Sequence, residues 1–252
     1  MSRFLDLFYE PKPIIGMLHL KGKNPEDTFA RFKKELTTYV DNKVDGVIVE
    51  TYFGTYADMV RALDYIRENA IPIPFGINCL NFDAMGFHLA CRYHADFVQL
   101  DSVVGHIQPR DEETEQAFLD WMRSQYRGFV LGGVRFKYQP VLSKNSLEDD
   151  LHIAMKRCDG ICITQERTGQ ETSLDKIREF RKYIGNFPLI VAAGVTSDNA
   201  RKSMAIADAA IVGSFFKDTG QDDGELCAEH IQALLNTVKE IRRNEHDSVN
   251  PR

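Results

Sequence analysis

The chain has 252 residues, and its 43% content of hydrophobic side chains is enough to bury one large core. Its 37 acidic and 31 basic side chains are interspersed and give a net charge of −6, which argues against a nucleic-acid-binding surface. No apolar run is long enough to span a membrane, the N-terminus lacks the pattern of a signal peptide, and the five cysteines lack metal-type spacing. We therefore expect a cytoplasmic protein with reduced thiols.

Short apolar runs rich in β-branched residues recur along the chain, and each is followed by a segment long enough for a helix. Eight such runs begin near Ile14, Asp45, Ile73, Asp96, Phe129, Asp159, Pro188 and Ala209. This alternation predicts a single (β/α)8 TIM barrel over residues 1–252, with a doubly wound parallel sheet as the alternative. Residues 1–12 are expected to form an N-terminal extension, and residues 245–252 a frayed tail.

The start of the first helix and the extension before the first strand carry further signals. Asn24-Pro25 predicts a helix start, because Asn caps the first turn and Pro suits the first helical position. The extension contains five apolar side chains: Phe4, Leu5, Leu7, Phe8 and Tyr9. They must either cover the bottom of the barrel or pack against another subunit, so the sequence leaves a homo-oligomer open.

Two apolar runs near the end of the chain stop abruptly at glycine. They are Val191-Ala-Ala-Gly-Val195 and Ala210-Ile-Val-Gly-Ser214. In a (β/α)8 barrel, the turns after the last two strands commonly hold a phosphate, because glycine lets backbone N–H groups approach an anion closely. Gly194, Gly213 and Ser214 therefore predict a binding site for a phosphorylated small molecule.

Polar side chains near the carboxyl ends of the predicted strands mark the mouth of the barrel, where active sites of this fold form. They are His19, Glu50, Asn78, Asp101, Lys137, Thr164 and Glu166. Glu50 follows three apolar residues, so desolvation should raise its pKa and let it transfer protons near neutral pH, unless it is a purely structural carboxylate. Strand spacing of roughly 4.8 Å puts Asn78 beside Glu50 and Asp101 about 10 Å from Glu50, although Asn78 could instead close a turn and Asp101 cap the next segment.

Other residues could contact a ligand at the same mouth. Lys137 could bind an anion or form an imine with a carbonyl group, with Arg135 as a neighbouring cation, or extend into solvent; we favour an anion or hydroxyl contact. Thr168 could donate hydrogen bonds from its loop, which could equally be a plain turn before the helix cap Ser173. Residues 103–111 could form a loop that closes over the site or a static one.

Neither a metal centre nor an organic cofactor has a clear signature in the sequence. His19 stands alone at the end of the first strand, which disfavours a centre built on several histidines. The sequence leaves open whether the carboxylates at the barrel mouth bind a divalent cation.

Six motifs at the strand ends occur in the order typical of one family. They are Ile15-Gly-Met-Leu-His19, Asp45-Gly-Val-Ile-Val-Glu50, Gly76-Ile-Asn78 with Asp83, Thr164 with Thr168-Gly169, Ala193-Gly-Val195 with Asn199, and Ile211-Val-Gly-Ser214 with Lys217. From about Pro13 to Val238 the chain resembles the BtpA/SgcQ family. The resemblance implies a phosphate-binding (β/α)8 barrel, and a role either in sugar metabolism or in photosystem biogenesis.

The chain also departs from the pattern of that family. Leu80-Asn-Phe-Asp83 stands where the family tends to have Leu-Arg-Asn-Asp, and Glu50 is followed by Thr51 rather than by Asn. Because the arginine is missing, we expect a divergent member with its own substrate.

Two functions of different classes fit these residues. The first is an enzyme that binds a phosphorylated sugar or nucleotide-like molecule through His19, Lys137, Thr164 and Thr168 and through the glycine turns. Its catalytic groups would be Glu50, Asn78, Asp101 and Glu166, and isomerisation, retro-aldol cleavage and N-glycosidic hydrolysis all fit. The second is a ligand-binding assembly or regulatory factor without turnover, which fold analogy alone does not separate from the first.

Overall fold

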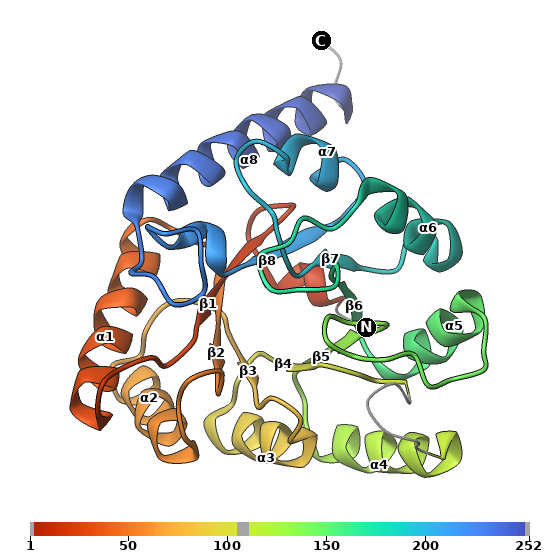
Figure 1. The fold of residues 1–252 in the computed structure, drawn as a ribbon, viewed down its shortest axis with the longest axis horizontal. Coiled ribbons are helices and arrows are strands. Elements are labelled where there is room, and N and C mark those ends of the chain that lie inside the picture. Colours follow the sequence, from red (N-terminus) through yellow and green to blue (C-terminus); the bar gives the residue numbers. More distant parts are fainter. Residues whose placement is uncertain (1–2, 105–110, 250–252) are drawn as a thin grey trace.

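The strands form one closed parallel barrel in chain order, as the computed structural model shows for the described residues, 3–104 and 111–249 (Figure 1). The strands are β1 (Ile14–Leu18), β2 (Gly46–Glu50), β3 (Phe75–Asn78), β4 (Phe97–Leu100), β5 (Phe129–Gly133), β6 (Gly160–Ile163), β7 (Leu189–Val191) and β8 (Ala209–Val212). β8 pairs with β1 and closes the sheet, so the (β/α)8 prediction is confirmed and the doubly wound alternative is wrong. Every strand begins within two residues of its predicted start.

Helices surround the barrel on its outside (Figure 1). They are α1 (Pro25–Asp41), α2 (Tyr56–Glu68), α3 (Asp83–Tyr93), α4 (Glu112–Gln125), α5 (Leu147–Arg157), α6 (Leu174–Ile184), α7 (Ala200–Met204) and α8 (Ala228–Val249), with short 3-10 helices η1 (Phe4–Leu7) and η2 (Ser214–Phe216). α1 begins as predicted, since the Asn24 side chain accepts a hydrogen bond of 2.9 Å from the backbone N–H of Asp27. α8 continues to Val249, well into the stretch expected to fray.

The buried apolar side chains form two layers. One lies between the strands and the helices, and the other fills the inside of the barrel. Phe4 belongs to the inner layer: its ring centroid lies 5.6 Å from that of Phe97 and 6.0 Å from that of Phe129, at the first residues of β4 and β5. The N-terminal extension therefore covers the bottom of the barrel, which is one of its two expected roles, while Tyr9 stays exposed.

An aspartate stands directly before each of β2, β4, β6 and β8. These residues, Asp45, Asp96, Asp159 and Asp208, accept hydrogen bonds of 2.8–2.9 Å from the backbone N–H groups of Ile14, Phe75, Val130 and Leu189. Each aspartate thus ties the start of its own strand to the start of the preceding one. Three of them also pair with an arginine: Arg242 with Asp45, Arg123 with Asp159 and Arg181 with Asp208. The bottom of the barrel is therefore closed by a repeated set of polar contacts.

Candidate active site

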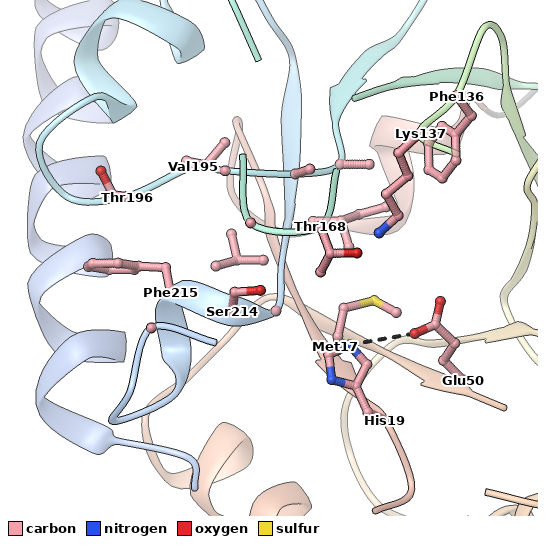
Figure 2. A pocket seen from close by; sticks show the side chains of 18 of the residues that line it. Met17, His19, Glu50, Phe136, Lys137, Thr168, Val195, Thr196, Ser214 and Phe215 are labelled. Atoms are coloured by element: carbon pink, nitrogen blue, oxygen red, sulfur yellow. Dashed lines mark ion pairs between the residues drawn. The ribbon is translucent and has the colours of Figure 1, made fainter. Parts of the chain in front are cut away.

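A cavity of about 210 Å³ opens at the carboxyl ends of the strands (Figure 2). Its wall is formed by side chains from β1, β2 and β4 and by the segments that follow β5, β6, β7 and β8. This is the end of a (β/α)8 barrel at which ligands bind.

The turns after β7 and β8 line this cavity and contain unpaired backbone donors. Within the described residues, the backbone N–H groups of Gly194, Val195, Gly213 and Ser214 make no hydrogen bond, and all four residues line the cavity wall. Gly194 has φ +72°, and a Cβ atom there would lie 2.2 Å from the carbonyl oxygen of Gln170. Only glycine therefore fits this turn without displacing the neighbouring loop.

The loop after β6 lies beside the same donors. A Cβ atom at Gly169 would be 3.3 Å from Oγ of Ser214, so this loop packs closely against the Ser214 side chain. The hydroxyl groups of Thr168 and Ser214 both point toward the cavity (Figure 2). The backbone N–H of Thr168 donates to Oη of Tyr138 at 3.1 Å. Ser173 caps α6, since its Oγ accepts from the N–H of Lys176 at 3.2 Å. The segment is thus both a turn before a helix and part of the cavity wall.

Glu50 and His19 form a buried pair in the cavity wall (Figure 2), and His19 lies beside the turn after β8, since a Cβ atom at Gly213 would be 3.2 Å from its Cε1 atom. Oε2 of Glu50 lies 3.5 Å from Nε2 of His19. Burial raises the pKa of Glu50 to about 8, and the nearby Asp101 carboxylate adds to that rise while Lys137 opposes it. Burial, with the charge of Lys217, lowers the pKa of His19 to about 4.

These two shifts make the pair electrically neutral at pH 7. Glu50 then carries its proton, and His19 is an uncharged imidazole. Nδ1 of His19 lies 3.4 Å from the carbonyl oxygen of Asp222, which can only accept, so the ring proton belongs on Nδ1 and the lone pair of Nε2 faces Glu50. A proton donor and a proton acceptor thus meet at the cavity wall.

Asn78 links Glu50 to a second carboxylate. Nδ2 of Asn78 donates to Oε1 of Glu50 at 3.4 Å and to Oδ1 of Asp101 at 3.1 Å. The two carboxyl groups therefore converge on one nitrogen and lie closer together than the expected 10 Å, because side chains on the inside of a barrel point toward its axis. Burial raises the pKa of Asp101. Neither Asn78 nor Asp101 is among the described residues that line the cavity.

Lys137 reaches the cavity from the loop after β5, with its ammonium group directed inward (Figure 2). Its backbone N–H donates to Oγ1 of Thr164 at 2.7 Å. Thr164 is fully buried and holds this loop rather than lining the described cavity wall. Glu166, proposed as a catalytic group from its position after β6, is exposed and lies outside that wall.

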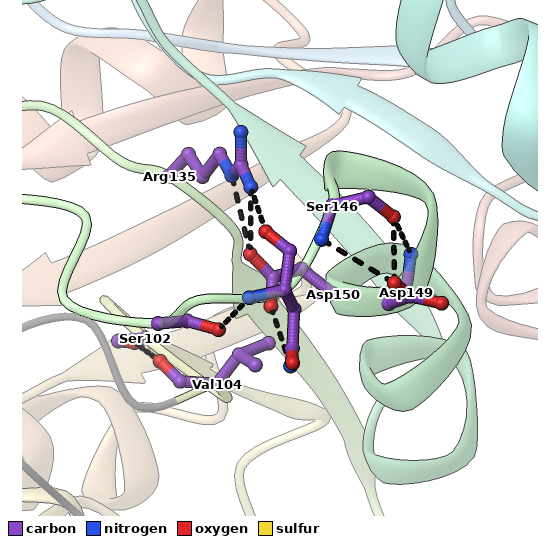
Figure 3. Close-up of polar contacts among 8 residues, drawn as sticks. Ser102, Val104, Arg135, Ser146, Asp149 and Asp150 are labelled. Carbon is purple, nitrogen blue, oxygen red and sulfur yellow. Dashed lines mark hydrogen bonds and ion pairs between the residues drawn. The ribbon is translucent and has the colours of Figure 1, made fainter.

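Arg135 does not lie beside Lys137 as a neighbouring cation. It pairs with the fully buried Asp150, with Nη2 3.1 Å from Oδ2, and also donates to the carbonyl oxygen of Asn145 at 3.1 Å (Figure 3). Asp150 lies in the first turn of α5, whose N-terminus is capped by Ser146. The loop that carries Lys137 is therefore fixed at its α5 end by Arg135 and at its β6 side by Thr164.

Sequence reasoning missed several side chains of the cavity, among them Met17, Gln99, Phe136 and Thr196. Met17 and Gln99 occupy inward positions of β1 and β4, two residues before His19 and Asp101. The alternation of side chains along a strand could have identified both of them.

The described residues contain no group of three or more His, Cys, Asp and Glu side chains arranged to hold a metal ion. Nor, in the same part of the chain, is any helix long and apolar enough to cross a membrane. Most of the predicted loop 103–111 lies outside the described residues.

The closed barrel and the cavity at its mouth, lined in part by polar side chains, place this chain in the class of (β/α)8 barrels with a polar mouth. The model of the BtpA family matches residues 10–240, and the chain belongs to this family.

Relatives and solved structures resemble the chain over most of its length. An uncharacterized protein of Methanocaldococcus jannaschii is 24% identical over 93% of this chain and 98% of its own length. The photosystem I biogenesis protein BtpA of Synechocystis is 23% identical over 92% of this chain and 90% of its own. Phosphoribosyl anthranilate isomerase from Thermus thermophilus has a TM-score of 0.59 at 12% identity, and the match covers 91% of this chain and 99% of its own. Thiamine phosphate pyrophosphorylase from Pyrococcus furiosus has a TM-score of 0.59 at 14% identity, covering 91% and 96%. At such identities the structures support the fold alone.

Proposed function

We propose that this protein is an enzyme that binds a phosphorylated sugar or nucleotide-like molecule at the barrel mouth and transfers a proton to or from it through Glu50. One observation carries the proposal: unpaired backbone N–H groups and the buried pair of Glu50 and His19 line the same cavity. An anion held at one wall would therefore place the rest of the molecule against a proton donor.

The phosphate end of the proposed site is built from backbone rather than from arginine. The N–H groups of Gly194, Gly213 and Ser214 would donate to phosphate oxygens, with the hydroxyl of Ser214 as a further donor. Lys137 supplies a positive charge at the same cavity. Two of the structural neighbours are named as enzymes of phosphorylated molecules, an isomerase of a phosphoribosyl compound and a thiamine phosphate pyrophosphorylase, which supports this assignment.

The proton-transfer end follows from the charge states of the pair. At pH 7 Glu50 holds a proton that it can give to a substrate oxygen, and the lone pair on Nε2 of His19 can accept a proton that the substrate releases. Asn78 and Asp101 orient Glu50, and Lys137 would contact an anionic or hydroxyl oxygen of the substrate. Isomerisation, retro-aldol cleavage and N-glycosidic hydrolysis each need such a transfer. Glu166 has no part in the proposal, because it lies away from the cavity.

The test starts from the molecule that stays bound through purification. Protein is denatured, and mass spectrometry of the supernatant identifies phosphate esters that are present with wild type and depleted with Ser214→Ala. Incubation of the candidate with wild type should convert it, whereas Glu50→Gln should bind it without converting it. If no phosphate ester is enriched, and a phosphate titration shows no binding either, the proposed site is wrong.

A second function is favoured by one observation, the name of the Synechocystis relative as a photosystem I biogenesis protein. In that case the cavity would hold a ligand without changing it, and the bound form would act in assembly. The same incubation separates the two functions: a ligand that binds tightly and is recovered unchanged after prolonged exposure to wild type supports the factor.

A further inference from the structure

Gln99 carries a buried amide without a hydrogen-bond partner. The residue is 4% exposed, and its Oε1 atom is enclosed without a partner. Its side chain makes no hydrogen bond to any described residue, and it lines the cavity at the barrel mouth. An unpaired buried amide is destabilising, since it has given up its bonds to water.

The surroundings of Gln99 offer no structural reason for a polar side chain. Phe97 lies two residues earlier on the same face of β4, and Leu131 is the register partner on β5. Both belong to the apolar layer inside the barrel. Gln99 thus borders an apolar layer on one side and the cavity on the other, so a partner can reach its amide from the cavity.

The position of Gln99 in the barrel defines which part of a ligand it would meet. In the closed strand order, β4 lies opposite β8. The unpaired N–H groups of Gly213 and Ser214 follow β8, so Gln99 faces the end of the cavity away from them, with Glu50 on the intervening β2.

We propose that Gln99 hydrogen-bonds a hydroxyl group at the end of the ligand opposite its phosphate, so that the site selects phosphorylated polyols over phosphate esters without hydroxyl groups. This inference rests on the proposed function, because it takes the phosphate to be bound after β7 and β8. A hydroxyl group suits the amide in either orientation, since it can donate to Oε1 or accept from Nε2. A site built around such a bond rejects an analogue that lacks the hydroxyl, because the amide is then left unpaired.

Calorimetric titration with matched ligands tests the inference. The probes are inorganic phosphate, the monophosphates of glycerol, erythritol and ribitol, and the n-alkyl phosphates of the same chain lengths. Wild type should bind at least one polyol phosphate about tenfold more tightly than its alkyl counterpart. Gln99→Met keeps the length of the side chain but removes the amide, so it should lose that preference and keep the affinity for inorganic phosphate.

The outcomes separate the two levels of the proposal. If wild type binds none of the phosphates, the proposed function fails. If wild type binds phosphates but shows no preference for a polyol, or if Gln99→Met keeps the preference, the assignment of Gln99 is overturned while the phosphate site stands. Gln99→Asn keeps the amide but shortens the side chain by one methylene, so it should lose the preference as well. This variant replaces Gln99→Met in the test if the Met variant does not fold.

Discussion

Glu50→Gln should make the folded protein more stable than wild type at alkaline pH. The substitution keeps the size of the side chain and its contact with Asn78 but removes the proton that Glu50 holds. Burial raises the pKa of Glu50 from 4.5 to about 8 in the folded protein. The folded state therefore binds this proton more tightly than the unfolded state does, and wild type loses stability as the pH rises from about 4.5 through about 8.

The size of the effect follows from the same shift. Each pKa unit corresponds to about 1.4 kcal/mol, so the rise of the Glu50 pKa amounts to about 5 kcal/mol when fully expressed, above pH 8. A glutamine cannot ionise and avoids this loss. The difference in unfolding free energy between Glu50→Gln and wild type should thus grow from near zero at pH 4.5 to about 5 kcal/mol at pH 9. The titration of His19 below pH 6.5 affects both proteins and cancels in the comparison.

Guanidinium chloride unfolding at pH 5, 7 and 9 measures this difference, provided that the denaturant dependence stays the same in both proteins. Glu166→Gln is the matched control, because it makes the same substitution at an exposed position outside the cavity. Only Glu50→Gln should gain stability with rising pH. If the unfolding free energies of wild type and Glu50→Gln stay parallel from pH 5 to pH 9, the reasoning is refuted. That result would mean that the pKa of Glu50 is the same in the folded and the unfolded protein.

Three further predictions concern the other parts of the barrel. Gly194→Ala should weaken phosphate binding at least about tenfold in a titration. Alanine is strained at φ +72°, and its Cβ atom would lie 2.2 Å from the carbonyl oxygen of Gln170, so the turn must shift. An unchanged affinity would show that this turn is not part of the phosphate site. Phe4→Ala should lower the unfolding free energy by about 3–5 kcal/mol and leave phosphate affinity unchanged, and a loss below about 1 kcal/mol would show that Phe4 does not close the bottom. Borohydride added with sugar phosphates should leave no adduct on Lys137, so a mass increase in the Lys137 peptide would make it an imine former.

The barrel could be predicted from the sequence because each strand is marked locally. A short apolar run stands between polar segments eight times, which predicts the strands, and the pairing of β8 with β1 then shows that the sheet closes. The role of the aspartates before alternate strands could not be predicted. Asp45 is visible in the sequence at the start of β2, but its bond to the N–H of Ile14 joins residues that only the closed barrel brings together.

The site was predictable as far as the strands extend. Glu50 ends β2 and points inward by alternation, and His19 comes directly after β1, so both could be placed at the mouth. Beyond a strand end the alternation stops. Arg135 has φ +48°, which breaks the extended backbone, and it therefore does not share a face with Lys137 as alternation suggested. Glu166 likewise lies beyond the end of β6, in a loop whose direction no local pattern determines, and it is exposed outside the described cavity wall.

The two ends of this barrel differ in how fully their polar groups are hydrogen-bonded. At the bottom, the aspartates accept strand N–H groups, three arginines pair with them, and Phe4 fills the axis. At the mouth, the N–H groups of Gly194 and Gly213 and the amide of Gln99 have no partner among the described residues. The enclosed amide oxygen of Gln99 costs stability unless something binds it. A closed and paired bottom can support that cost, and the concentration of unpaired donors and acceptors around one small cavity is therefore the strongest physical argument that the mouth is built to hold a polar ligand.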